Sequence, residues 1–169
     1  IDGMKSSHFD LYYLYSNTSQ GTLRYRDSRP SIRKKEGGVK ERLMIRRFRC
    51  QNCRTYHNEL PDCLVPYKHY EAEVIAGVLD EVVLPDDLDS EDYPSVHTMI
   101  RWLQWFYENL QRIEGYLRTA GYQLLHLGEE ILFTSDSLLN KIRSRHQNWL
   151  ELILRIIYNS GGSLVPIRW

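Results

Sequence analysis

The chain has 169 residues, which is enough for one domain of ordinary size or two small ones. Apolar residues make up 42% of it and include 12 tyrosines, so a packed core is expected and global disorder is excluded. No apolar run reaches the roughly 20 residues that a membrane-spanning helix needs, and three cysteines are too few for a disulfide scaffold. We therefore expect a cytoplasmic protein with no membrane partner.

The formal net charge is zero, but the charges are unevenly distributed along the chain. Residues 24–54 contain 12 Lys or Arg and three acids, whereas residues 71–92 contain nine acids and no Lys or Arg. Such segregation concentrates positive potential on one part of a neutral molecule. One interpretation is a phosphate-binding lobe beside an acidic neighbour, and the alternative is two solvated faces that attract each other.

The first part of the chain, residues 8–66, is predicted to form a small β-rich module. Aromatic content favours extended structure at residues 8–15. Further strands are expected over Leu23–Arg29, Ser31–Lys35 and Lys40–Cys50. Residues 36–38, with the sequence Glu-Gly-Gly, are expected to turn a hairpin. Residues 50–66 contain two prolines and are predicted to be irregular.

From residue 67 to 169 the apolar periodicity is helical, and an all-helical domain is expected. A first helix has an apolar face made of Ala72, Ile75, Ala76, Leu79 and Val83, and Pro85 ends it. A long amphipathic helix of about 25 residues should begin at Pro94. A last helix, capped by Asp136 or Ser137, should continue through Leu139, Ile142, Trp149, Ile153 and Ile156. The predicted fold class is α+β, with a zinc-ribbon-like module before a helical body.

A basic run at residues 46–49 ends in a C-x-x-C knuckle formed by Cys50 and Cys53. Two thiolates at this spacing can share one metal ion, but a structural zinc site needs four ligands. His57 and Cys63 follow at spacings that could complete such a site. We expect no bound metal, with one structural zinc at the knuckle as the alternative.

Two groups of polar residues are candidates for binding DNA. Guanidinium groups suit phosphate, and the basic candidates of the β module are Arg33, Lys34, Lys35, Arg46, Arg47 and Arg49. The order of helix, connector and Pro94 helix is that of a helix-turn-helix, whose second helix enters the major groove by its first residues. The candidates there are Ser95, His97, Thr98 and Arg101. The alternative is an ordinary amphipathic helix with a solvated polar face.

Several stretches together resemble a known family. They are Ile45-Arg46-Arg47-Phe48-Arg49-Cys50-x-x-Cys53, residues 57–62, residues 65–68, Pro94-Ser95-x-x-Thr98-x-Ile100-Arg101-Trp102, and the closing Asn159-Ser160 and Arg168. The chain resembles a bacterial family of unknown function found beside insertion-sequence transposase genes, whose members join a zinc ribbon to a helix-turn-helix. The resemblance implies DNA binding in a mobile-element setting. Where the family has a first C-x-x-C-Gly, this chain has Ser16-x-x-Ser19-Gln20-Gly21, and serine is a poor zinc ligand.

No sequence feature indicates an enzyme. The acidic residues between Asp86 and Asp92 are crowded in one connector, whereas two-metal chemistry needs carboxylates that converge from separate elements. The chain has no G-x-S-x-G elbow, P-loop, H-E-x-x-H or dinucleotide fingerprint. We therefore expect neither catalysis nor a small-molecule substrate.

The predicted function is that of a nucleoid-associated accessory or regulatory protein of a transposable element. Its expected partners are double-stranded DNA and either a transposase or a second copy of the chain. The alternative is a protein-interaction or oligomerisation module that has lost metal and DNA binding, with the long helix and residues 149–158 as docking face. A third option is RNA binding, with Tyr25 and Phe48 stacking on single-stranded bases.

Overall fold

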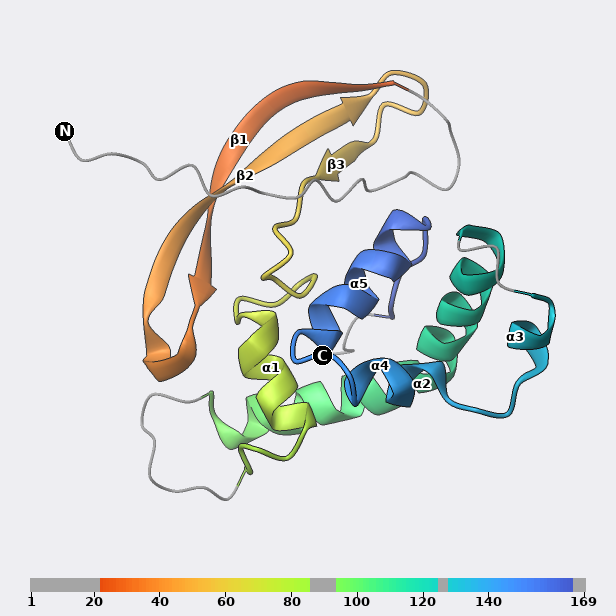
Figure 1. The fold of residues 1–169 in the computed structure, drawn as a ribbon. Helices are drawn as coiled ribbons and strands as arrows, with labels where there is room; N and C mark the ends of the chain where they lie inside the picture. Colours follow the sequence, from red (N-terminus) through yellow and green to blue (C-terminus); the bar gives the residue numbers. More distant parts are fainter. Residues whose placement is uncertain (1–21, 86–93, 125–127, 166–169) are drawn as a thin grey trace.

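The computed structural model describes residues 22–85, 94–124 and 128–165. In these residues a three-stranded antiparallel sheet lies beside a body of helices (Figure 1). The predicted α+β class is therefore confirmed. The expected strand at 8–15, the serines at 16 and 19, the acidic connector and Arg168 lie outside the described residues. Among the described helices, none has both the length and the apolar character that a membrane crossing requires.

The sheet is built on a long hairpin. Strand β1 (Leu23–Lys34) pairs with β2 (Lys40–Cys50), and β2 pairs with the short strand β3 (Tyr56–Asn58). The turn contains Gly37 and Gly38, with φ of 69° and 72°. Positive φ favours glycine, because a Cβ would be strained there. The predicted turn and the strand over residues 40–50 are confirmed.

Two predicted details of the sheet were wrong. We expected Pro30 to separate two strands, but β1 continues through it. Pro30 is tolerated because β1 lies at the edge of the sheet, where an outward N–H needs no partner. We also expected residues 50–66 to be irregular, whereas residues 56–58 form β3. A three-residue strand is defined by its pairing with Arg47–Arg49 rather than by a pattern of its own.

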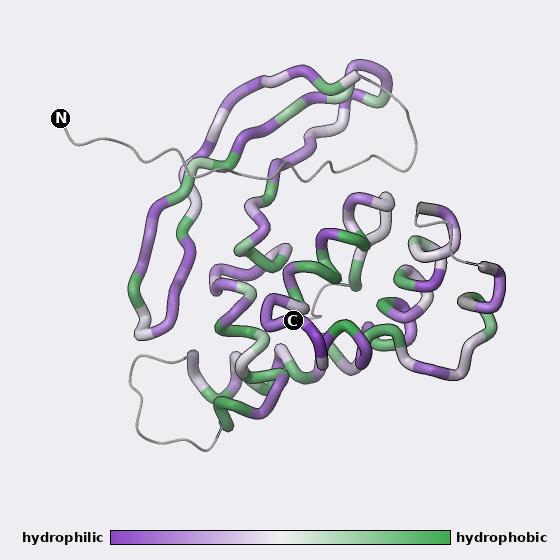
Figure 2. Tube along the Cα trace, viewed as in Figure 1, coloured by the Kyte–Doolittle hydropathy of each residue, from purple (hydrophilic) through white to green (hydrophobic). Residues whose placement is uncertain are grey.

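The helical body packs around one apolar core. Its helices are α1 (Ala72–Leu79), α2 (Val96–Leu124), α3 (Glu130–Phe133), α4 (Leu138–Arg143) and α5 (Trp149–Asn159). Figure 2 shows apolar segments where α1, α2 and α5 meet, and polar stretches along the hairpin. Ile75, Ile113 and Ile153 are among the fully buried side chains of this core. Helix α2 has 29 residues, more than the roughly 25 that periodicity indicates.

The predicted last helix is interrupted, so the prediction of one continuous helix was wrong. Ser137 caps its start as predicted, and its Oγ accepts a backbone hydrogen bond in the first turn at 3.0 Å. The helix ends at Arg143 and a new helix begins at Trp149, because residues 144–148 carry no apolar side chain to place in the core. Asp80 fixes the break: its carboxylate pairs with Arg143 and accepts a hydrogen bond from Trp149 Nε1 at 2.8 Å.

The sheet is attached to the body through residues 59–71, the connecting segment between β3 and α1. The backbone N–H of Lys34 donates to the carbonyl of His69 at 2.6 Å, and the N–H of Glu71 donates to the carbonyl of Lys34 at 3.0 Å. Arg155 of α5 pairs with Asp62 of the same segment at 2.7 Å. These contacts fix the sheet over one end of the helical body. The expected domain boundary after residue 66 falls within this segment and remains a prediction.

Candidate nucleic-acid interface

Five arginines on one side of the sheet form a group that we call the arginine face: Arg24, Arg26, Arg29, Arg47 and Arg49. Arg33 lies on the same side nearer the hairpin turn, where it pairs with Glu41. The register places Arg24 opposite Arg49, and directly paired side chains point to the same side. Arg29 is opposite Ile45, which lies two residues before Arg47 and therefore on the same face. Four of the five are exposed and Arg47 is half-buried, so the face presents its charge to solvent.

A β-bulge and a tyrosine organise this face. The register shifts between Tyr25 and Asp27, so Arg26 is an extra residue in β1, and such bulges re-aim side chains. The guanidinium carbon of Arg26 lies 4.7 Å from the centre of the Tyr56 ring. Those of Arg47 and Arg49 lie 5.6 Å and 5.9 Å from it. Cations at these distances are attracted to the ring face, so Tyr56 gathers three guanidinium groups at the surface.

One carboxylate, that of Asp27, pairs with the arginine face. Arg47 donates to it from Nε at 2.6 Å and from Nη2 at 2.5 Å, and Arg26 lies 3.6 Å away. The hydrogen bond from Arg47 is the main cause that lowers the pKa of Asp27. The carboxylate is therefore ionised at neutral pH. Five guanidinium groups and one carboxylate leave four net positive charges among the described residues of this face.

Two of the basic residues predicted to bind DNA form ion pairs near the hairpin turn, and their role in DNA binding remains a prediction. The guanidinium of Arg33 pairs with Glu41 at 2.5 Å and with Glu71 at 3.1 Å, and it donates to the sulfur of Cys63 at 3.0 Å. Lys35 pairs with Glu41 at 2.9 Å. The contacts of Arg33 connect the end of the hairpin to the start of α1, which is a structural role.

Of the six predicted basic residues of the β module, Arg47 and Arg49 belong to the arginine face, and Arg33 lies on the same side of the sheet near the turn. Arg46 points to the opposite side of β2 and pairs with Glu59, whose side chain is only 6% exposed. Lys34 lies over the ring of Tyr70 at 4.7 Å. The structure thus adds three arginines of β1 that sequence reasoning missed. Strand alternation combined with the hairpin register could have placed Arg24 and Arg29, but the bulge at Arg26 has no sequence signal.

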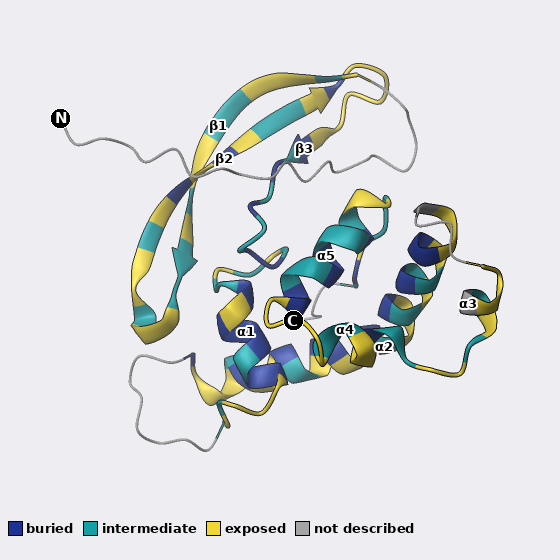
Figure 3. Ribbon diagram, in the orientation of Figure 1, coloured by how far each residue is buried: buried dark blue, intermediate teal, exposed yellow. Residues whose placement is uncertain are grey.

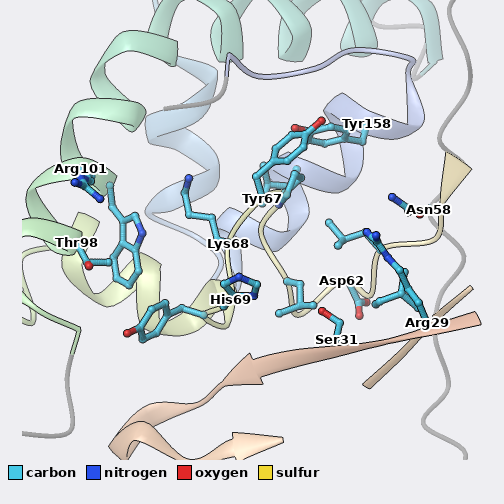
Figure 4. Close-up of a pocket in the computed structure, with 17 residues that line it drawn as sticks. Arg29, Ser31, Asn58, Asp62, Tyr67, Lys68, His69, Thr98, Arg101 and Tyr158 are labelled. Carbon is cyan, nitrogen blue, oxygen red and sulfur yellow. The ribbon is translucent and has the colours of Figure 1, made fainter. Parts of the chain in front are cut away.

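A cleft of about 620 Å³ opens where the sheet meets the helical body (Figure 4). Its walls come from four parts of the chain. The sheet contributes Arg29, Ser31, Ile45 and Asn58, and the connecting segment contributes residues between 60 and 70. Helix α2 contributes Thr98, Arg101 and Trp102, and α5 contributes Leu154 and Tyr158. Arg29 therefore belongs both to the arginine face and to the cleft.

The four residues predicted at the Pro94 helix all lie at its start. The carbonyl of Ser95 accepts hydrogen bonds from the N–H groups of Thr98 and Met99 at 2.7 Å and 3.1 Å, which begins α2. Thr98 and Arg101 line the cleft, whereas Ser95 and His97 are exposed. Residues 80–95 separate α1 from α2, a longer connection than the three- or four-residue turn of a typical helix-turn-helix. The helix-turn-helix remains a prediction.

Lys68 is the half-buried cation of the cleft. Its ammonium group lies 4.7 Å from the centre of the Trp105 ring. Burial disfavours the charged form and lowers the pKa of Lys68 to about 8. Asp62 is the carboxylate of the described lining, and Arg155 pairs with it from outside the cleft at 2.7 Å. The lining therefore has an excess of positive charge.

The C-x-x-C knuckle forms a tight turn between β2 and β3. The N–H of Arg54 donates to the carbonyl of Cys50 at 3.0 Å, and the N–H of Cys50 donates to the carbonyl of Thr55 at 3.0 Å. Cys50 is buried and Cys53 is exposed. The turn thus has a clear structural role, since it reverses the chain into β3.

The other two candidate metal ligands lie on different elements. His57 is buried on β3 opposite Phe48, and its Nε2 has no hydrogen-bond partner in the described residues. Cys63 lies beside Arg33, and burial raises the pKa of its thiol. Within residues 22–85, 94–124 and 128–165, no three His, Cys, Asp or Glu side chains are grouped as metal ligands. The zinc alternative stays a prediction, because the serines at 16 and 19 lie outside these ranges.

The comparisons with known proteins give one match. A family model described as a domain of unknown function, DUF6431, matches residues 16–102, about half of the chain. The matched region includes the hairpin, the knuckle, the connecting segment and the first turns of α2, and therefore the arginine face and most of the cleft. No curated protein and no solved structure matches the chain.

Proposed function

This chain belongs to the DUF6431 family of domains of unknown function. We propose that it binds double-stranded DNA without catalysing a reaction. The observation that carries the proposal is the arginine face. Its five guanidinium groups come from two paired strands and face one way, with a net positive charge. A surface of this kind attracts the phosphate backbone irrespective of sequence.

The arginine face is also organised before any ligand arrives. Tyr56 gathers Arg26, Arg47 and Arg49, and Asp27 orients Arg47 through two hydrogen bonds. Holding guanidinium groups in place reduces the entropy lost when they engage phosphate oxygens. The single carboxylate thus positions one arginine, while the other guanidinium groups supply the attraction.

The start of α2 supplies a second contact. Arg101 and Thr98 line the same cleft as Arg29 of the sheet, so positive side chains of both lobes surround one cavity. The beginning of a long helix also carries a partial positive charge that favours phosphate. A duplex bound across the arginine face would therefore reach α2 at the cleft.

The biological setting that we propose is a transposable element, in which the protein acts as an accessory or regulatory factor. This part rests on the resemblance of residues 45–68 and 94–102 to the transposase-associated family. A transposase encoded beside the gene, or a second copy of the chain, is the expected protein partner.

The proposal is tested by titrating a labelled duplex of about 20 base pairs with the full chain at low salt and measuring fluorescence anisotropy. Replacing Arg26→Gln and Arg49→Gln together should weaken binding roughly tenfold, because two phosphate contacts are lost. Arg42→Gln is the matched control, since Arg42 is exposed on the opposite face. We expect less than a twofold change there. A wild-type chain that binds no duplex at low salt would contradict the proposal.

A second candidate function is self-association, and the observation that favours it is the exposed apolar surface of the hairpin rather than the expected docking segment. Residues 149–158, the expected docking segment, place Trp149, Ile153 and Ile157 in the core of the single chain. Exposed apolar side chains occur instead on the hairpin side opposite the arginine face, where Ile32 is 45% and Met44 50% exposed. Sedimentation of the wild type and of Met44→Asp tests this candidate function. Self-association predicts that the wild type is a dimer and that Met44→Asp is a monomer.

A further inference from the structure

The cleft has the size and lining of a small-molecule site. Its volume of about 620 Å³ lies within the range of roughly 300–1,000 Å³ typical of ligand pockets. Leu60, Leu64 and Leu154 give it apolar walls. Such a space is too large for a single ion and too apolar for a sugar alone. A ligand that fills it needs an apolar surface of its own.

Aromatic rings form one end of the cleft. Tyr158 of α5 and Tyr67 of the connecting segment lie together there in Figure 4. Tyr67 is 84% exposed and has a φ of 64°. An aromatic residue rarely adopts this conformation, and strained residues of this kind cluster at binding sites. The backbone therefore presents a large exposed ring at the mouth of the cleft, where it can stack on a planar ligand.

Lys68, Arg29 and Arg101 are the Lys and Arg residues of the lining, which also includes the rings of Trp102 and Tyr70. Figure 4 shows Lys68 between Arg101 on α2 and Arg29 on β1. Lys68 reaches Trp105 with its ammonium group, and burial keeps its pKa near 8. A bound anion would favour the protonated ammonium, because an opposite charge nearby stabilises the charged form. Anion binding near pH 8 should therefore take up protons.

One polar group in the lining is unsatisfied. The Oδ1 of Asn58 is buried and accepts no hydrogen bond from any residue that the structure describes. Buried acceptors normally have partners, and an unpaired one costs stability.

We propose that this cleft binds a single nucleotide, with the base at Tyr67 and Tyr158 and the phosphate at Lys68 and Arg101. The nucleotide is either free or an unpaired residue of a nucleic-acid chain, since both present the same base and phosphate. This goes beyond duplex binding, because a free nucleotide fills the cleft whether or not DNA is bound. It also departs from the expectation that the chain has no small-molecule ligand.

Binding of a free nucleotide is tested by calorimetric titration of the full chain. The ligands are deoxyadenosine monophosphate, deoxyadenosine and inorganic phosphate, at pH 8 in two buffers of different ionisation enthalpy. The monophosphate should bind at least about tenfold more tightly than either fragment, because only it engages both ends of the cleft. Its binding should be accompanied by proton uptake. Equal affinity for the monophosphate and for inorganic phosphate would overturn the assignment of the base to the tyrosine end.

Two variants connect the binding to the cleft. Tyr67→Ala and Lys68→Met should each weaken the monophosphate about tenfold, by loss of stacking and of a charge-assisted contact. Lys68→Met should also abolish the proton uptake, which a merely structural role would not do. Lys40→Met is the control, because Lys40 is exposed near the hairpin turn. Thermal unfolding of each variant verifies the fold.

Binding of an unpaired residue of a nucleic-acid chain is tested with two duplexes, one fully paired and one with a single unpaired nucleotide. The unpaired nucleotide should tighten binding, and Tyr67→Ala should remove the difference. If neither the monophosphate nor the unpaired nucleotide is preferred, the cleft proposal fails, even when the arginine face still binds paired DNA. Conversely, monophosphate binding without duplex binding would support the cleft proposal and contradict the proposed function.

Discussion

The helical body and the sheet are stabilised by different interactions. In the body, Ile75, Ile153 and Ile157 are completely buried, and Figure 3 shows buried residues on the inner sides of α1, α2 and α5. In the hairpin most side chains stay partly exposed, and the buried ones of β2 are Leu43, Ile45 and Cys50. The body thus depends on apolar burial, whereas the sheet depends on backbone pairing and on charged contacts.

This difference is relevant to the proposed binding of DNA. Exposed ion pairs contribute little to stability, typically below about 1 kcal/mol each. Side chains such as Arg26 and Arg49 can therefore be replaced without unfolding the protein, and they are available to a ligand. The core of the body fixes the position of the sheet and of α2, and the sheet displays the charge.

The largest contrast is expected for apolar truncation in the two regions. Ile153→Ala should lower the free energy of unfolding by about 3 kcal/mol, because it leaves a cavity in a fully packed core. Ile32→Ala, at a 45% exposed position of the hairpin, should cost less than about 1 kcal/mol. Urea unfolding measures both. Similar values would mean that the two regions do not differ as we describe.

A smaller contrast is expected within the charged contacts of the sheet. Glu59 is 6% exposed and makes a two-pronged pair with Arg46. Glu59→Gln should therefore cost roughly 1–2 kcal/mol, since it weakens a hydrogen-bonded charge that is shielded from water. Glu41→Gln is the control, because Glu41 is 42% exposed and its ion pairs are screened by solvent, so its loss should cost less than that of Glu59. Equal costs in urea unfolding would contradict this ranking.

The smallest effect concerns the pH dependence that Lys68 confers. Its pKa is about 8 in the folded chain and 10.5 without burial, so between these values the unfolded chain binds more protons. Stability contributed by this group should therefore rise as pH increases from 8 towards 10.5. The slope should stay below the roughly 1.4 kcal/mol per pH unit of a full proton, because the difference in bound protons between the two states is below one throughout this range. Lys68→Met should lack this rise when urea unfolding is compared at pH 8 and pH 9.5.

Local sequence patterns were sufficient to predict much of the fold. The alternation in β2, the glycines of the turn, the periodicity of α2 and the cap at Ser137 each depend on residues close together in the chain. The break after Arg143 is only partly local, because residues 144–148 lack apolar side chains but Asp80, far away in the sequence, contacts both ends of the break. Strand β3 likewise depends on its partner.

The candidate site was less predictable for the same reason. The basic composition of residues 24–54 pointed to the lobe that carries the arginine face, but it could not tell Arg46, which pairs with Glu59, from Arg49, which lies over Tyr56. That difference depends on the strand register and on a bulge. The cleft was not predicted at all, since its walls come from four parts of the chain and no single segment carries its pattern.

The most direct test of the account is the salt dependence of duplex binding. If four net charges of the arginine face engage phosphates, log Kobs should fall with log salt at a slope of about −4, and Arg26→Gln/Arg49→Gln should reduce it to about −2. Arg42→Gln should leave the slope unchanged. A wild-type slope near zero, or an equal reduction by Arg42→Gln, would contradict the claim that this face of the sheet binds DNA.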